Sequence, residues 1–437
     1  MKVSVELHML PVKAGDATLI LETDTDTDRG YPYAVLIDTG LDAEEAHTYI
    51  QNFGVRHLDL VILSHPDADH IGGFLAIMRD PSIKISKLWC FDLSFLREFV
   101  RTGKIPEPES DTHRITYGGV LYDLITQGDI LKQAAINGVS AYQVSEGHRL
   151  NVGSLHIEVL YPWDGFYNQL RSPRSLKRLL ANKWPEDWER ASRTTNDRER
   201  RCRPSARELS APEEQKFLRE LLEKHGFPEQ SSTIIGSVPP DSKEDEAEES
   251  DEESETVSLP TIGTLYNNLS IVLKIHRLGG MAAPTMLFPG DLSDWTYLVA
   301  RRWHDLEATI FKYPHHGSAD VGLSERALFD RSFVPGRCPS GPWCSYDCYR
   351  EHYYWWREVL LAAQSDQAML FSKMIQPSHT LVFPYPKYHL PTTSSLRSMT
   401  GRLHANRVST ALKDLGSKDN DPTPCILEVG LEESQIT

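Results

Sequence analysis

The sequence lacks the features of a membrane protein and of a disulfide-stabilised secreted protein. No apolar stretch approaches the length of about 20 residues that a membrane-spanning helix needs. The first residues alternate like a strand and do not form the apolar core of a signal peptide. The six cysteines lie at scattered positions, which argues against a disulfide framework. We therefore expect a cytoplasmic protein that has no membrane partner.

An excess of positive charge is also absent, because the formal net charge is −16. Residues 241–255 alone contain ten acidic residues and one lysine, so this tract contributes −9 of that charge. The tract has almost no apolar residue and cannot bury enough surface to offset the entropy lost on ordering, so we expect a disordered loop. The remaining chain is only mildly acidic, and the net charge therefore does not exclude a nucleic-acid substrate.

The side chains with metal-binding chemistry concentrate in residues 64–73, which read SHPDADHIGG. This segment directly follows residues 58–63, an apolar run that predicts a buried strand, and the residues after it predict the start of a helix. The polar side chains therefore lie at the carboxyl end of a strand, where open α/β sheets place their binding sites.

The spacing within this segment provides two groups of ligands. His65 and Asp67 are two residues apart and project together from an extended chain, whereas Asp69 and His70 fall where the chain turns into the helix. Two divalent ions about 3.5–4 Å apart could share such ligands, as in two-metal hydrolases. The alternative is a polar turn with solvated histidines, because Pro, Asp and Gly are also common turn residues.

The segment HPDADH at residues 65–70 resembles the H-x-[HD]-x-D-H motif of the metallo-β-lactamase superfamily. The aspartate at its third position resembles the β-lactamase-like nuclease domain of ComEC proteins. Further segments resemble the same family in the same order: residues 14–20 with 36–40, residues 267–273 with 287–291, and residues 312–318. Four collinear matches are far more specific than any one of them.

The resemblance implies an α/β fold of the metallo-β-lactamase type, which is an αββα four-layer sandwich. Residues 1–163 and 263–437 would form its two halves, with the metal loop in the first half. Residues 164–262 would be an insertion that holds a basic arm, a helix and the acidic loop. A second insertion, rich in aromatic residues and cysteine, would lie near residues 331–365.

The resemblance also implies a ligand set for two divalent ions: His65, Asp67, Asp69, His70, Asp291 and His316. In the family, the aspartate at the position of Asp291 bridges the two ions, although Asp is also a good helix N-cap. Asp69 and His315 are candidates for catalysis, His315 as a phosphate contact or proton donor. The sequence alone does not distinguish which of His315 and His316 binds metal.

Three further residues are candidates for a position behind the ligands. Asp38 either orients a ligand histidine or is a turn residue. Asn268 lies where many superfamily members have a histidine ligand, so we expect an oxygen-rich site that favours Mn²⁺, with Zn²⁺ or Mg²⁺ as alternatives. His148 lies between two predicted strands and either reaches the site or is a surface residue.

Residues 386–391 resemble the end of the ComEC-type domain. This resemblance makes His389 a candidate phosphate contact and Lys387 a candidate electrophilic partner. A polar loop that precedes a helix would have a similar sequence.

Two other clusters have weaker signals. A structural zinc site is one interpretation of Cys338, Cys344, Cys348 and His352, and reduced thiols in an aromatic-rich insertion are the other. The basic segment 171–207 combines tryptophans with an arginine cluster, which suits phosphate contacts and base stacking. The arginines are Arg198, Arg200, Arg201 and Arg203, and a solvated helix is the alternative interpretation.

Together these patterns predict a metal-dependent phosphodiester hydrolase, and DNA is the expected substrate. The expected nucleophile is a hydroxide shared by the two ions. One alternative is a metallo-hydrolase of a small ester, lactone or cyclic nucleotide. Another is a subunit that binds protein partners in a larger assembly, such as a defence complex, which the acidic loop and the aromatic insertion favour.

Overall fold

The computed structural model describes the first half of the chain almost continuously and the second half in shorter segments. The described residues are 3–10, 12, 15–24, 29–103, 111–171, 207–213, 215–225, 265–278, 285–302, 305–317, 321, 379–382, 407–410, 425–429 and 435–436. Among them, no helix is both long and apolar enough to cross a membrane.

The first layer of strands is a nine-stranded mixed sheet with the order β11-β8-β7-β5-β3-β2-β1-β17-β18. Its strands are β1 (Val3–Met9), β2 (Thr18–Asp24), β3 (Tyr33–Ile37), β5 (Leu60–Ile62), β7 (Lys87–Cys90), β8 (Ser140–Gln143), β11 (Arg207–Leu209), β17 (Cys425–Val429) and β18 (Gln435–Ile436). Strands β3, β5, β7 and β8 are parallel. All three residues of β5 are buried, as expected for a parallel strand covered on both faces.

The second layer is a seven-stranded sheet with the order β16-β15-β14-β13-β12-β10-β9. Its strands are β9 (Arg149–Val152), β10 (Leu155–Tyr161), β12 (Val272–Arg277), β13 (Thr285–Phe288), β14 (Ile310–Lys312), β15 (His379–Val382) and β16 (Arg407–Thr410). In β10, Leu155 and Ile157 are buried while His156 and Glu158 are partly exposed, so one face of this sheet points into the core. A separate parallel ladder joins β4 (His57–Leu58) and β6 (Lys84–Ile85).

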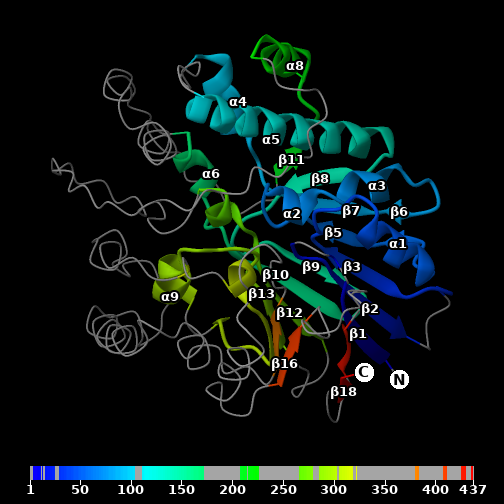
Figure 1. The fold of residues 1–437 in the computed structure, drawn as a ribbon. Coiled ribbons are helices and arrows are strands. Elements are labelled where there is room, and N and C mark those ends of the chain that lie inside the picture. The colour runs from blue at the N-terminus through cyan, green and yellow to red at the C-terminus, as the bar shows by residue number, and fades with distance from the viewer. Residues whose placement is uncertain are drawn as a thin grey trace, which may run out of the picture.

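Helices cover the outer face of each sheet (Figure 1). The helices beside the nine-stranded sheet are α1 (Glu45–Asn52), α2 (Ala68–Ile71), α3 (Phe74–Arg79), α4 (Ser94–Arg101) and α5 (Asp111–Ile136), and α8 (Gln215–Lys224) packs on α5. Helix α9 (Thr296–Arg302) lies on the other side, against β10. Short helices are α6 (Phe166–Gln169), η2 (Asn267–Leu269) and η4 (Pro314–Gly317).

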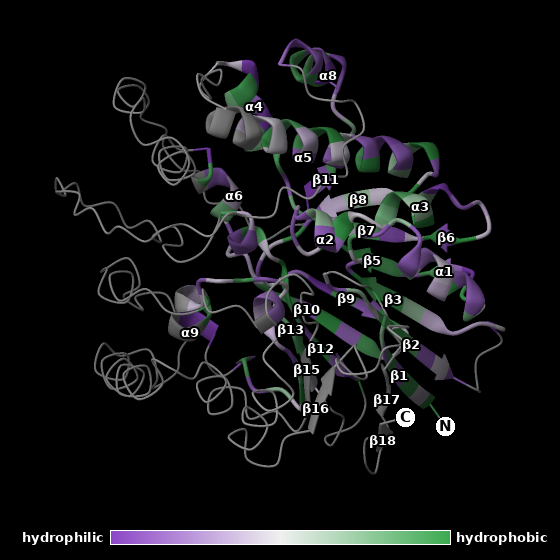
Figure 2. Ribbon diagram, in the orientation of Figure 1, coloured by the Kyte–Doolittle hydropathy of each residue, from purple (hydrophilic) through white to green (hydrophobic). Residues whose placement is uncertain are grey.

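The buried apolar residues form one core between and around the two sheets. Figure 2 shows apolar residues concentrated on the central strands and hydrophilic residues on α1 and α8. The αββα four-layer sandwich that the sequence predicted is therefore confirmed.

The sequence pattern predicts helices over residues 122–137 and 292–301, and both helices begin at other residues in the structure. Helix α5 starts at Asp111, ahead of the predicted start at Tyr122, because packing on the sheet and on α8 outweighs the low helix propensity of a Gly-Gly pair. Helix α9 starts at Thr296 and not at Leu292. The Asn268 side-chain oxygen accepts a 2.9 Å hydrogen bond from the Asp294 amide. This contact holds residues 292–295, which precede α9, in a turn.

Candidate metal centre

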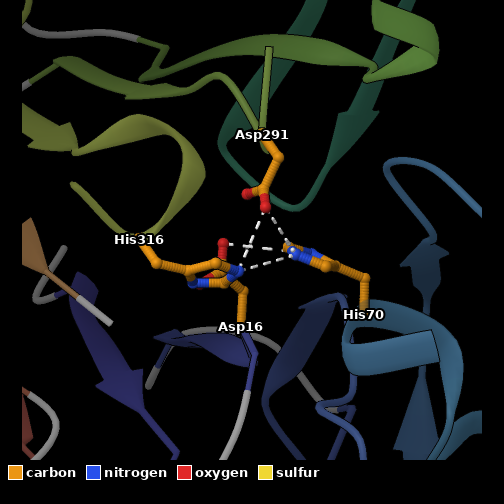
Figure 3. A group of neighbouring side chains, drawn as sticks. All are labelled: Asp16, His70, Asp291 and His316. Atoms are coloured by element: carbon orange, nitrogen blue, oxygen red, sulfur yellow. Dashed lines mark hydrogen bonds and ion pairs between the residues drawn. The ribbon is translucent and has the colours of Figure 1, made fainter. Parts of the chain in front are cut away.

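Four segments that are distant in sequence meet where the two sheets face each other. The turn between β1 and β2 carries Asp16, and α2 carries His70. Asp291 follows β13, and His316 lies in η4 after β14. One ligand atom from each of these four side chains lies within 4.8 Å of the other three (Figure 3). Figure 3 shows the side chains pointing toward one another from both sheets, and all four are largely buried.

Asp291 is at the middle of this cluster. Its Oδ2 atom lies 3.2 Å from His70 Nε2, 3.0 Å from His316 Nε2 and 4.0 Å from His65 Nε2. Asp69 Oδ2 approaches the same His316 nitrogen at 3.2 Å. One carboxylate oxygen thus faces three imidazole nitrogens, which is the arrangement expected of a bridging ligand.

His65 provides a test of whether a cation fits. Its ring is fully buried, and its Nε2 atom has no hydrogen-bond partner among the described residues. This atom lies 3.4 Å from Asp67 Oδ2, while the Asp67 side chain is 36% exposed. Because a buried polar atom without a partner is costly, a metal ion between these two residues would supply the missing interaction. The donor set therefore fits divalent metal ions.

The charges of the cluster are strongly coupled. Burial disfavours the charged form of His316, but Asp291 and Asp16 outweigh this effect and raise its pKa well above the ordinary value. Burial likewise opposes the ionised form of Asp69, yet His70 and His316 lower the pKa of this carboxyl. Asp291 likewise outweighs the effect of burial on His70 and raises its pKa well above the ordinary value, so the carboxylates favour the protonated forms of His70 and His316. A divalent cation would compete with those protons for the same atoms.

Left-handed backbone conformations concentrate at this centre. Among the described non-glycine residues, positive φ angles occur at Asp38 (57°), His315 (45°) and His316 (52°). Each such residue costs about 1–3 kcal/mol unless its surroundings compensate, and such strain clusters at functional sites. The backbone is therefore strained at three residues whose side chains lie in or beside the Asp and His cluster.

Asp38 orients His70. Its Oδ1 accepts a 2.7 Å hydrogen bond from the Ser64 amide, and its Oδ2 accepts one of 2.7 Å from the Ser64 hydroxyl. His70 Nδ1 lies 2.9 Å from Oδ2, so this ring nitrogen donates and Nε2 faces Asp291. These contacts place Asp38 behind His70, and its role in orienting a metal ligand stays a prediction.

The remaining predicted residues lie in different surroundings. The ring nitrogens of His315 lie 3.2 and 3.4 Å from the Asn267 amide nitrogen, so this residue is beside the cluster while His316 is within it. Asn268 is buried, and its side-chain oxygen accepts a hydrogen bond from the Asp294 amide in the loop after Asp291. His148 packs edge-on against Trp89, and its described contacts do not connect it to the cluster.

Several predicted site residues lie outside the described part of the chain, and their roles stay predictions. They are Lys387, His389, Cys338, Cys344, Cys348, His352, Arg198, Arg200, Arg201 and Arg203.

Sequence reasoning missed two members of the centre, Asp16 and Lys312. Asp16 had been noted only as part of the segment that resembles the opening hairpin of the family, and Lys312 only as the first residue of the segment with the histidine pair. A usable signal was the Gly15-Asp16 pair, because a glycine before an acidic residue in a hairpin turn permits close approach to another loop. Gly15 has a φ of 85°, and a Cβ atom there would lie 1.5 Å from the Asp69 carbonyl oxygen.

One known protein family matches part of the sequence. The sequence model of the metallo-β-lactamase superfamily matches residues 33–87, which include the whole metal loop. This match supports the metallo-β-lactamase superfamily. Together with the Asp and His cluster, it supports a metal-dependent hydrolase. No curated protein sequence matches the chain significantly.

The similarity of the chain to solved structures is distant. The metallo-β-lactamase fold protein YhfI from Bacillus subtilis is 10% identical, with 94% of this chain and 97% of that chain covered and a TM-score of 0.37. A CmlA β-hydroxylase mutant is 10% identical, with 94% and 52% covered and a TM-score of 0.34. A diphosphatase of the PhnP family is 12% identical, with 36% and 57% covered and a TM-score of 0.21.

Proposed function

We propose that the protein is a metal-dependent phosphodiester hydrolase and that its substrate is DNA. The observation that carries the proposal is the approach of Asp291 Oδ2 to the Nε2 atoms of His70 and His316, at 3.2 and 3.0 Å. These three residues come from both sheets, so only the complete fold brings them together.

The donor atoms divide into two groups that share Asp291. One group contains His65 and Asp67, and the other contains Asp69, His70 and His316. We assign one divalent ion to each group. Bound there, the ions would supply Lewis-acid polarisation of a phosphoryl group and activation of water. Half of the six ligands are carboxylates, which supports Mn²⁺ as the preferred ion ahead of Zn²⁺ and Mg²⁺.

Residues around these ligands would handle the substrate. His315 is half-buried beside the cluster, and Asn267 holds its ring. We assign to His315 the contact with the scissile phosphate or the delivery of a proton to the leaving oxygen. The arginine-rich segment 171–207 supports a polymeric substrate, because a small ester does not need an extended cationic surface.

The direct test compares wild type with Asp291→Asn on plasmid DNA in a series of Mn²⁺, Zn²⁺ and Mg²⁺. We expect hydrolysis to fall by about 100-fold or more, because loss of groups that merely support a metal ligand already costs about 10–100-fold. The control is Asp59→Asn, which removes an ion pair with Arg29 at the opposite end of β5 and should retain activity. Equal activity in wild type and Asp291→Asn would indicate a contaminating nuclease and contradict the proposal.

A separate experiment tests the class of substrate by comparing hydrolysis of several compounds. Single-stranded DNA, RNA and bis-para-nitrophenyl phosphate should be compared with small esters, lactones and cyclic nucleotides under the same metal conditions. Cleavage of the DNA substrates is the expected result. Turnover of a small substrate with intact DNA would replace this proposal by the small-molecule alternative.

A further inference from the structure

Lys312 places a buried positive charge directly behind the metal centre. The residue ends β14 and is only 3% exposed. Its ammonium group donates to the Gly290 carbonyl oxygen at 2.8 Å, lies 3.2 Å from Asp291 Oδ1 and forms an ion pair with Asp16 Oδ2. The ammonium group therefore has three oxygen partners, two of them through hydrogen bonds. One oxygen of Asp291 is thereby held away from the cluster, and only Oδ2 faces the histidines.

Both carboxylate oxygens of Asp16 face positively charged or titratable protein groups in ion pairs. Oδ2 pairs with Lys312, and Oδ1 lies 3.2 Å from His316 Nδ1. This contact is an ion pair, because neither Asp16 oxygen has a hydrogen-bond partner of good geometry among the described residues. An ionised carboxylate attracts positive charge and only accepts hydrogen bonds, so Asp16 favours the form of His316 that carries a proton on Nδ1. The other ring nitrogen, Nε2, then points at Asp291 and Asp69. Asp16 thus stands behind His316 as Asp38 stands behind His70.

The backbone fixes Asp16 in this place. Its amide donates to the Asp69 carbonyl oxygen at 3.3 Å, and its carbonyl oxygen accepts from the Gly40 amide at 2.8 Å. The turn that carries Asp16 is therefore attached to the loops that carry the other groups of the centre. Such attachment suits a positioning group, whose geometry must be set before metal arrives.

We propose that Asp16 and Lys312 are positioning residues for the metal ligands and that neither binds metal. Lys312 holds Asp291 so that one oxygen is presented to the ions, and Asp16 sets the tautomer and direction of His316. The inference rests on the proposed metal-dependent function, and it goes further by assigning Asp16 a different role from the other three residues that converge on the centre, His70, Asp291 and His316.

The test measures binding of Co²⁺ to the full chain, because the visible absorption of this ion reports the number and kind of its ligands. The variants are Asp16→Asn and Lys312→Met, with Asp59→Asn as a control carboxylate in a remote ion pair. The side-chain amide introduced by Asp16→Asn would have one acceptor oxygen and could serve Lys312 or His316, but not both. We expect Asp16→Asn to bind as many Co²⁺ ions as wild type with the same spectrum and with affinity reduced about 10–100-fold.

Lys312→Met should alter the Co²⁺ spectrum, because it frees the second oxygen of Asp291. Should this variant not fold, the double variant Asp16→Asn/Lys312→Met removes both charges of the pair and should melt at a higher temperature than Lys312→Met in chelator. If the double variant is no more stable than Lys312→Met, the ion pair between Asp16 and Lys312 is contradicted.

Three outcomes would overturn the proposal. Loss of a Co²⁺ ion or a changed spectrum in Asp16→Asn would make Asp16 a ligand. Unchanged affinity in Asp16→Asn would remove its positioning role. No Co²⁺ binding by wild type would refute the centre itself, whereas Co²⁺ binding without hydrolysis of DNA would refute only the proposed function.

Discussion

At the scale of single residues, the metal centre depends on contacts that tolerate no added atoms. Gly15 combines a φ of 85° with a position in which a Cβ atom would lie 1.5 Å from the Asp69 carbonyl oxygen. Gly54 has a similar φ of 79°, but nothing lies within 4 Å of the corresponding position. The two glycines therefore separate the cost of backbone conformation from the cost of steric overlap.

Gly54→Ala should lower the free energy of unfolding by about 1–2 kcal/mol, because only the left-handed conformation is penalised. Gly15→Ala should cost clearly more, because the Asp16 turn and the Asp69 backbone must also separate. The measurements are urea unfolding and Mn²⁺ affinity, which should weaken only in Gly15→Ala. Equal effects of the two substitutions on stability and affinity would contradict the close approach.

Asp38→Asn tests the orientation of His70. Asn tolerates the left-handed backbone at this position, so the fold should persist. The amide nitrogen cannot accept a hydrogen bond, and the variant therefore cannot serve both the Ser64 amide and His70. We expect metal affinity to fall about 10–100-fold, measured by competition with a chelating dye. Unchanged affinity would show that Asp38 acts only in the turn.

At the scale of elements, α8 packs on the long helix α5. Leu218 and Leu222 are buried against α5, while Arg219 pairs with Asp129 at 2.8 Å. The helix lies on the far side of α5 from the sheets and away from the metal centre (Figure 1). We therefore infer that its packing contributes to stability without taking part in metal binding.

Leu222→Ala should destabilise the docked helix by about 2 kcal/mol or more, because it leaves a cavity at a buried position. Hydrogen exchange of residues 215–224 should accelerate while metal affinity stays unchanged. Phe217→Ala, on the exposed side of the same helix, should change stability by only about 0.5 kcal/mol. A loss of metal affinity in Leu222→Ala would contradict the separation of α8 from the site.

The sequence identified the segments that meet at the centre, because their ligand types and spacing are local properties. The 64–73 loop could be placed after a strand for the same reason. The strand predicted over residues 58–63 is shorter in the structure, because β5 covers Leu60–Ile62 and Leu58 belongs to β4 in a separate ladder. The Asp16–Lys312 pair could not be found in this way, since nearly 300 residues separate its members and only the two-sheet topology joins them. The choice between His315 and His316 also depended on backbone angles that no pattern of residue types reveals.

At the scale of the whole molecule, the centre connects the two sheets. Asp16 and His70 belong to the layer built on the nine-stranded sheet, whereas Asp291 and His316 follow strands of the seven-stranded sheet. A second connection is made by Glu22 of β2, which accepts hydrogen bonds from the Ser154 amide and hydroxyl at 2.9 and 2.7 Å. Separation of the layers would therefore dismantle the metal centre.

Metal binding should for this reason stabilise the entire fold and not one loop. A ligand at 100 times its dissociation constant adds about 2.7 kcal/mol to the free energy of unfolding. We expect Mn²⁺ or Zn²⁺ to raise the melting temperature of wild type in a concentration-dependent manner. The same ions should have little effect on Asp291→Asn, and an equal rise in both proteins would place the binding elsewhere.

The number of divalent ions bound per chain tests the central claim most directly. Equilibrium dialysis of the full chain against Mn²⁺ or Zn²⁺, followed by elemental analysis, should give about two ions in wild type. Asp291→Asn should bind fewer, with an unchanged circular dichroism spectrum. A wild-type chain that retains no ion above the buffer concentration, or an Asp291→Asn chain that retains as many as wild type, would contradict a centre built around this carboxylate.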